Sequence, residues 1–266
     1  MTIGTSYYVP STNNDVEKGF LLASAASGAV MATLPLFSKP FINQMKREHA
    51  NNEEYKDAFL KSFKNSGLRE NGVTLQHVGM NSIAKKDVKE GLNAFYSPDA
   101  RTINLNFDKA SISAFHEAGH AINHLQSRLG NFLQKLRAPG YTVAGLMGTV
   151  ALFSRKKPEE NDHGFLDFVQ NNCGKIAFAA MLPTVAEEAM ASHKGIKLAR
   201  AGGLGEAAIK NLKKFYGKAL MSYAGYAIAT GISVGLANKI MQHYTRPKKV
   251  TLQQEFPQAY YPYQRF

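Results

Sequence analysis

Residues 116–120 read His-Glu-Ala-Gly-His, and this pentapeptide decides the fold that the chain is expected to adopt. In a helix, residues four positions apart lie one turn apart on the same face, so His116 and His120 would hold one Zn²⁺ ion between them. Glu117 would project beside them, where a carboxylate takes a proton from a metal-bound water. The pentapeptide therefore predicts a helix that carries a zinc site of the metallopeptidase type.

The flanking sequence predicts a strand followed by one long helix. Residues 101–107 alternate between polar and apolar side chains, which is typical of a half-buried strand. Apolar residues then recur at helical spacing from Ile112 to Leu133, which predicts a helix over 111–136 that ends before Pro139-Gly140. The motif is thus expected in the middle of a helix, beside an apolar wall that shields a metal from water.

A catalytic zinc ion needs a third protein ligand and an open position for water. His124 is a poor candidate, because on a straight helix it lies about 12 Å along the axis from His116, and we expect it to pack or to support the ligands. A better candidate is the pair Glu187-Glu188, which follows Pro183 in the first turns of another expected helix. Adjacent helical residues diverge by about 100°, so only one glutamate of the pair can face the ion.

The order of the motifs resembles that of the integral-membrane zinc metallopeptidases of the HtpX type and, more closely, the YugP-type neutral zinc metallopeptidases. The matching segments are Tyr96-Ser97-Pro98, residues 116–122, Leu182-Pro183 and residues 188–192. The resemblance covers roughly residues 70–240 and implies a gluzincin-type site in which Glu188 is the third ligand. The HtpX-type pattern has an Asp four residues after that ligand. This chain has Ser192 there, whose weaker hydrogen bonds would support the ligands.

The expected mechanism follows from this resemblance and from the motif. His116, His120 and Glu188 would bind one Zn²⁺ ion, and Glu117 would act as general base for attack of water on a peptide carbonyl. An extended substrate would pair with an edge strand at 102–107. The residues expected to bind substrate are Asn93, Ala94, Phe95, Ile103 and Asn104.

Four apolar stretches predict helices that cross a membrane, at 19–37, 138–154, 166–186 and 219–238. The first and last are long enough to cross about 30 Å of hydrocarbon. The middle two would form a hairpin that leaves the zinc helix and brings the chain back to Glu188. With four crossings, the zinc residues share one side with 22 of the 32 Lys and Arg residues. The positive-inside rule then predicts a bacterial-type inner membrane protein whose catalytic side faces the cytoplasm.

Together these patterns predict a mostly α (α+β) fold, with a zincin-like helical unit, a short β-sheet and about four transmembrane helices. The expected parts are a polar segment at 1–18, a membrane-embedded metallopeptidase domain at 19–250 and a disordered Tyr-, Pro- and Gln-rich tail at 251–266. The net charge of +12 is scattered and lacks a nucleic-acid signature, so we expect a lipid bilayer and peptide or membrane-protein substrates as partners, and no nucleic acid. The single cysteine, Cys173, excludes an internal disulfide framework.

Two other interpretations stay open at this stage. One is a non-catalytic membrane scaffold with a structural zinc site, although such a site normally fills its fourth position with protein and the sequence offers no clear fourth ligand. The other is a soluble zinc hydrolase whose apolar helices form its core, which the mildly negative mean hydropathy of −0.26 favours. The sequence does not indicate an oligomeric state.

Overall fold

The computed structural model describes residues 3–48, 52–79, 86–108, 112–155 and 164–254. Over these residues the chain is mostly helical with short sheets, which confirms the predicted fold class. The helices are α1 (Asn13–Met31), α2 (Leu34–Glu48), α3 (Asn52–Asn65), α4 (Lys86–Lys89), α5 (Ser113–Gln126), α6 (Arg128–Leu152), α7 (Phe165–Ala201) and α8 (Glu206–Tyr244). The strands are β1 (Ile3–Val9), β2 (Thr74–His77), β3 (Phe95–Ser97), β4 (Thr102–Leu105) and β5 (Lys248–Gln254).

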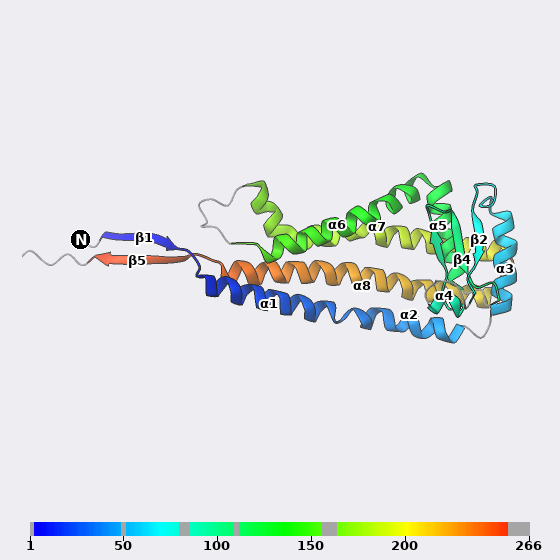
Figure 1. The fold of residues 1–266 in the computed structure, drawn as a ribbon, viewed down its shortest axis with the longest axis horizontal. Helices are drawn as coiled ribbons and strands as arrows, with labels where there is room; N and C mark the ends of the chain where they lie inside the picture. The colour runs from blue at the N-terminus through cyan, green and yellow to red at the C-terminus, as the bar shows by residue number, and fades with distance from the viewer. Residues whose placement is uncertain (1–2, 49–51, 80–85, 109–111, 156–163, 255–266) are drawn as a thin grey trace, which may run out of the picture.

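The molecule is an elongated helical bundle with a different structure at each end (Figure 1). Its long helices are α1 with α2, α6, α7 and α8, and they run side by side in extensive contact. We use the term head for α3, α4, α5 and the three-stranded sheet, which lie together at one end, while the antiparallel pair β1–β5 extends from the other (Figure 1). Because α7 and α8 have 37 and 39 residues, both reach from the bundle into the head.

The head and the bundle have separate apolar cores. The head core contains large side chains such as Phe59, Phe115 and Phe215. The bundle core is built largely from alanines, and its helices approach closely at glycines. A Cβ atom on Gly174 of α7 would lie only 2.7 Å from the carbonyl oxygen of Gly231 on α8. Small residues thus let α7 and α8 pack backbone to backbone.

The helix that carries the pentapeptide is shorter than expected. It ends at Gln126, because Ser127 adopts an extended conformation and its hydroxyl accepts a hydrogen bond from the N–H of Gly130, which starts α6. Pro139 does not end this next helix, which continues to Leu152. The expected single helix over 111–136 is therefore wrong. The apolar pattern continues through the capping serine, so the pattern does not indicate that one helix ends there and another begins.

Both ends of the chain contain structure that the sequence did not indicate. Strand β1 pairs with β5 over seven residues, from Ile3 opposite Gln254 to Val9 opposite Lys248. The segment 1–18, expected only to be polar, contains a strand and the start of α1, and the expected disordered tail contains the end of β5 up to residue 254. The rest of that tail, residues 255–266, lies outside the described residues. The two strands are too far apart in sequence for a local pattern to reveal their pairing.

The strand predicted at 101–107 is confirmed as β4, but it is the central strand of the sheet β2-β4-β3. It pairs with β2 in parallel and with β3 antiparallel, so its backbone has no free edge. Ile103 and Asn104 are buried within this strand. The expectation that a substrate pairs with this strand as a sheet edge is therefore wrong, and both β4 and β3 contact α5.

Within the described residues, two helical segments have the length and hydropathy of membrane spans, not four as expected. They are Asn13–Gln44, with an 18-residue window of mean hydropathy 1.8, and Glu206–Tyr244, with a window of 1.3. They contain the expected spans 19–37 and 219–238. The other two expected spans lie in α6 and α7 but do not reach this hydropathy, because glycines, threonines and Pro139 dilute the first and Lys175 interrupts the second.

Candidate metal centre

The two helices that form the site, α5 and α7, touch through their backbones. A Cβ atom on Gly119 would lie 2.1 Å from the carbonyl oxygen of Ala191, and one on Gly195 would lie 2.7 Å from that of Phe115. Any side chain at these two positions would push the helices apart. Gly119, inside the pentapeptide, is thus part of what brings Glu188 on α7 within reach of the histidines on α5.

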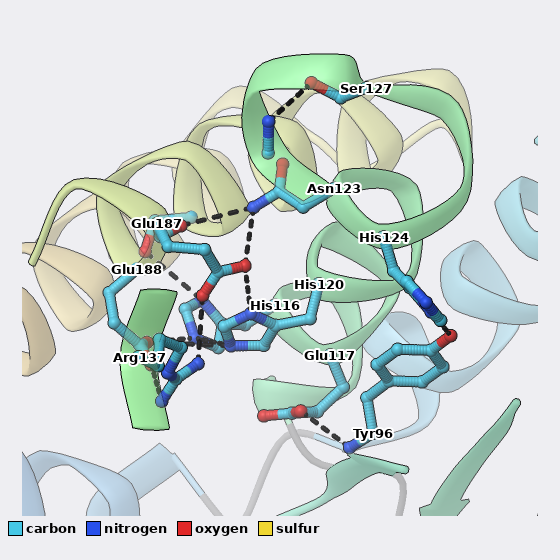
Figure 2. Close-up of polar contacts among 12 residues, drawn as sticks. Tyr96, His116, Glu117, His120, Asn123, His124, Ser127, Arg137, Glu187 and Glu188 are labelled. Atoms are coloured by element: carbon cyan, nitrogen blue, oxygen red, sulfur yellow. Dashed lines mark hydrogen bonds and ion pairs between the residues drawn. The ribbon is translucent and has the colours of Figure 1, made fainter. Parts of the chain in front are cut away.

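Three ligand atoms of the expected residues converge at this contact (Figure 2). The Nε2 atom of His116 lies 2.9 Å from Glu188 Oε2 and 3.0 Å from His120 Nε2, and the third side of the triangle, from His120 Nε2 to Glu188 Oε2, is 3.6 Å. Ligands of one tetrahedral zinc ion, at bond lengths of about 2.0–2.2 Å, lie about 3.3 Å apart. All three side chains are buried. Their positions therefore fit one shared metal ion.

The other ring nitrogen of each histidine is held by a residue on α7. His120 Nδ1 lies 2.8 Å from Glu187 Oε1, and His116 Nδ1 lies 3.2 Å from the hydroxyl oxygen of Ser192. An ionised carboxylate only accepts hydrogen bonds, so Nδ1 of His120 carries a hydrogen, and Nε2 is left to bind either a proton or a metal ion beside Glu188. Such outer partners orient metal-binding histidines in many proteins. The arrangement therefore brings Nε2 of both histidines and an oxygen of Glu188 close together, where they can bind a cation.

A proton and a metal ion compete for this point. Burial alone would lower the pKa of His120, but hydrogen bonds with Glu187 and Glu188 outweigh it and raise the pKa to about 10. Burial alone would raise the pKa of Glu188, but hydrogen bonds with His116 and His120 hold it well below its usual value. Because histidine binds metal only when it is neutral, binding of a metal ion at this site would require the release of this proton.

A cation from α6 pairs with both buried glutamates. The guanidinium group of Arg137 donates to Glu187 Oε2 at 2.9 Å and to Glu188 Oε1 at 2.8 Å, so it bridges the adjacent carboxylates (Figure 2). Asn123 adds a hydrogen bond to Glu187 Oε1 at 2.8 Å. Sequence reasoning missed Arg137, Asn123 and the contact between Glu187 and His120. The available signal was chemical, since two adjacent acids in an apolar stretch need a buried cation nearby.

We expect Arg137→Met to destabilise the metal-free protein strongly. The change leaves two carboxylates, of which Glu187 is 0% exposed and Glu188 1%, without their cation. Breaking a buried ion pair in this way costs about 3–5 kcal/mol. Thermal unfolding of the detergent-solubilised protein, with and without zinc, measures the loss, which zinc should partly restore. The control Arg137→Lys keeps the charge and should lose less stability. Equal stability of Arg137→Met and the wild type would contradict this role of Arg137.

Glu117 lies on the same helix but outside the triangle of ligand atoms. Its Oε2 atom accepts a hydrogen bond of 2.8 Å from the backbone N–H of Tyr96 on β3. Burial raises the pKa of Glu117, and the nearby histidines partly offset the rise. The hydroxyl of Tyr96 lies 2.9 Å from Nδ1 of His124, so His124 supports this strand and not the metal ligands. Strand β3 thus fixes the carboxylate beside the candidate metal position.

A cavity of about 410 Å³ adjoins the site, with His116 and Glu117 in its wall. Asn93 and Ala94 also line it, and the remaining walls come mainly from α2 and α8. Phe95, also expected to bind substrate, is 42% exposed and does not line the cavity. A substrate could therefore reach the candidate metal position and the carboxylate through one shared space.

Comparisons with known proteins do not place the chain in a family. No family model, no curated protein and no solved structure matches it. A function must therefore be argued from the chemistry of the site.

Proposed function

We propose that the protein is a membrane zinc metalloendopeptidase that resembles the YugP-type enzymes. In this proposal, His116, His120 and Glu188 bind one Zn²⁺ ion and Glu117 is the general base. The observation that carries it is the convergence of two imidazole nitrogens and one carboxylate oxygen within 3.6 Å, while the outer nitrogens are engaged elsewhere. Two histidines and a glutamate are a ligand set of catalytic zinc, which keeps its fourth position for water.

The chain's own residues supply the proton transfers of peptide hydrolysis. Zinc, when bound, would polarise the substrate carbonyl and acidify a water molecule. Glu117, held in place by the N–H of Tyr96, would accept the proton of that water and pass it to the leaving amine. The adjoining cavity would hold part of the substrate beside these two groups.

The surroundings of the site favour catalysis over a structural role. A structural zinc ion would need a fourth protein ligand. Besides Glu188, two acids lie near the histidines among the described residues. Glu187 is already occupied by His120, Asn123 and Arg137, and Glu117 accepts a hydrogen bond from the N–H of Tyr96. The cavity with His116 and Glu117 in its wall instead adjoins the candidate metal position. These contacts support an enzyme more than a scaffold.

Peptide hydrolysis by the purified full-length protein tests the proposal. We expect cleavage of casein or of unstructured peptides, loss of this activity with the chelator 1,10-phenanthroline, and recovery when zinc is restored. The non-chelating isomer 1,7-phenanthroline is the control for effects of the compound other than metal removal. A preparation that contains zinc and cleaves none of these substrates would overturn the proposed activity.

The exposure of the bundle supports a membrane location. A core helix of a soluble protein is mostly buried, but only 6% of the apolar window in Asn13–Gln44 is buried, and only 33% of that in Glu206–Tyr244. Exposed large apolar side chains also occur along α6 and α7. On the four helical segments they include Leu21, Leu22, Leu36, Tyr141, Leu146, Phe178, Leu182, Met221, Ile228 and Ile232. Because so large an apolar surface is unfavourable in water, we propose that α6 and α7 cross the bilayer together with the other two segments.

Four crossings would put the head and the β1–β5 pair on opposite sides of the membrane (Figure 1). Arg137 directly precedes the apolar stretch 138–154, and Glu188 closely follows 166–186, so the metal centre would lie at the membrane surface on the side of the head. That side carries 22 of the 32 basic residues, which favours the cytoplasm. This position suits peptides or membrane proteins as substrates.

We expect the protein to remain in the membrane fraction after washes with high salt and with alkaline carbonate, and to be released by detergent. Salt and alkali remove proteins held by charge or by other proteins, whereas spanning helices stay in the hydrocarbon. Fractionation beside a known peripheral and a known integral protein provides the control. Release by alkali alone would contradict the membrane-spanning bundle and favour a soluble hydrolase.

A further inference from the structure

We infer that the cavity beside Glu117 is a substrate subsite that accepts a large, uncharged, apolar side chain next to the scissile bond. This inference rests on the proposed peptidase function, and it adds the chemical class of the residue that the enzyme would select. It follows from the position of the cavity, from the chemistry of its walls and from one small residue that sets its size.

The cavity lies between the catalytic helix and the two apolar segments of the bundle. One wall contains Glu117 and His116, and the opposite walls come from Phe41 and Ile42 on α2 and from residues of α8. The rings of Phe41 and Phe215 pack with their centroids 4.8 Å apart. A side chain in this space would therefore belong to a residue adjacent to the bond that Glu117 helps to cleave.

The polar groups in the walls are largely engaged within the protein. The hydroxyl of Tyr216 donates to the carbonyl of Ile112 at 2.7 Å, and that of Ser222 to the carbonyl of Phe37 at 3.1 Å. The amide of Asn93 is bound on both sides, by Asp87 at 3.0 Å and by the N–H of residue 94 at 2.9 Å. These groups have their partners already and do not compensate a polar side chain for its lost hydration.

The charges in the cavity walls also favour an uncharged substrate side chain. Apart from Glu117 and His116, none of the described residues that line the cavity carries a carboxylate, ammonium, guanidinium or imidazole group. An acidic substrate side chain would lie next to the Glu117 carboxylate. A lysine would lose its water with no acid to pair with other than Glu117, which the proposed reaction itself uses. Leucine or phenylalanine would instead fill the apolar space, which an alanine would leave largely empty.

Ala219 sets the size of the subsite from the α8 wall. It is buried, lines the cavity, and lies one helical turn from both Phe215 and Tyr223. A leucine at this position would extend into the space that the substrate side chain needs. Gly217, on the same helix, has nothing within 4 Å of an added Cβ atom, so a leucine there adds the same bulk outside the cavity.

The test compares peptides that differ only at the residues flanking the cleaved bond, with full-length protein in detergent. We expect kcat/KM for Leu or Phe to exceed that for Ala by at least about tenfold, and Asp and Lys to be cleaved least. Ala219→Leu should reduce cleavage of the Leu and Phe peptides by at least about tenfold and largely spare the Ala peptide. Zinc content should be unchanged, and Gly217→Leu should keep the wild-type preference.

Three outcomes would overturn the subsite. They are a wild-type enzyme without preference, an Ala219→Leu variant that loses all peptides equally while it retains zinc, and a Gly217→Leu variant that shows the same shift. Each leaves the peptidase function standing, because cleavage is still observed. Failure of the wild-type protein to cleave any peptide would overturn the proposed function itself, and the subsite with it.

Discussion

Glu188→Ala should lower the zinc affinity of the protein by more than about a hundredfold. Loss of an outer partner of a metal ligand costs about 10–100-fold in affinity, and loss of a ligand should cost more. Glu188 Oε2 lies 2.9 Å from His116 Nε2, on the side where the two histidines face each other. Arg137 keeps its contact with Glu187 in this variant, so no buried charge is left unpaired. Competition with a fluorescent zinc chelator measures the affinity.

The adjacent Glu187 provides a matched control. It lies on the same helix and binds the same arginine, but it contacts the outer nitrogen Nδ1 of His120. We therefore expect Glu187→Ala to lose zinc affinity only to the extent typical of an outer partner, about 10–100-fold. The opposite order, with the greater loss at Glu187, would show that the wrong glutamate has been assigned to the metal.

Glu117→Gln should lower peptide hydrolysis by about 10²–10⁴-fold, the usual contribution of a general base. The amide has the size of the carboxylate, and its oxygen can still accept the hydrogen bond from the N–H of Tyr96. It cannot accept the proton of a metal-bound water. Initial rates on one peptide, at equal zinc loading, measure the loss. Glu90→Gln, at a partly exposed glutamate paired with Lys86, controls for the removal of one negative charge.

The features predicted from the sequence are those that lie within one element. The spacing of His116 and His120 puts both on one face of α5, and the alternation at 101–107 predicts β4. Glu188 is different, because its position depends on the close contact between α5 and α7. Gly119 and Gly195 make that contact possible, and no spacing along the chain reveals it. Its role could be suggested only by resemblance to a family.

The features that were missed depend on contacts between distant parts of the chain. Arg137 reads as a basic residue before an apolar stretch, and only the packing of α6 against α7 brings it to Glu187 and Glu188. The same applies to the β1–β5 pair, whose strands join the two ends of the chain. The break at Ser127 is local, but a single capping residue is a weak signal inside an apolar pattern. It nevertheless changes the direction of the chain between α5 and α6.

Hydropathy and the proposed topology give different numbers of membrane crossings. The stretches in α1–α2 and α8 meet a composition test, whereas those in α6 and α7 do not. Their proposed crossing rests on their position beside α8 and on their exposed apolar side chains. Lys175 and the glycines that permit close packing lower the mean hydropathy of these two helices. The composition test and the proposed topology thus differ at α6 and α7, the two helices whose small residues pack closely against their neighbours.

The most direct test of the proposed metal centre is to measure zinc per chain and peptide hydrolysis on the same samples of wild type, Glu117→Gln and Glu188→Ala. We predict one bound zinc ion and cleavage for the wild type. Glu117→Gln should retain the zinc without cleavage, and Glu188→Ala should lack both. Cleavage by Glu117→Gln at the wild-type rate, or full zinc retention by Glu188→Ala, would contradict the assignment of Glu117 as base and of Glu188 as the third ligand.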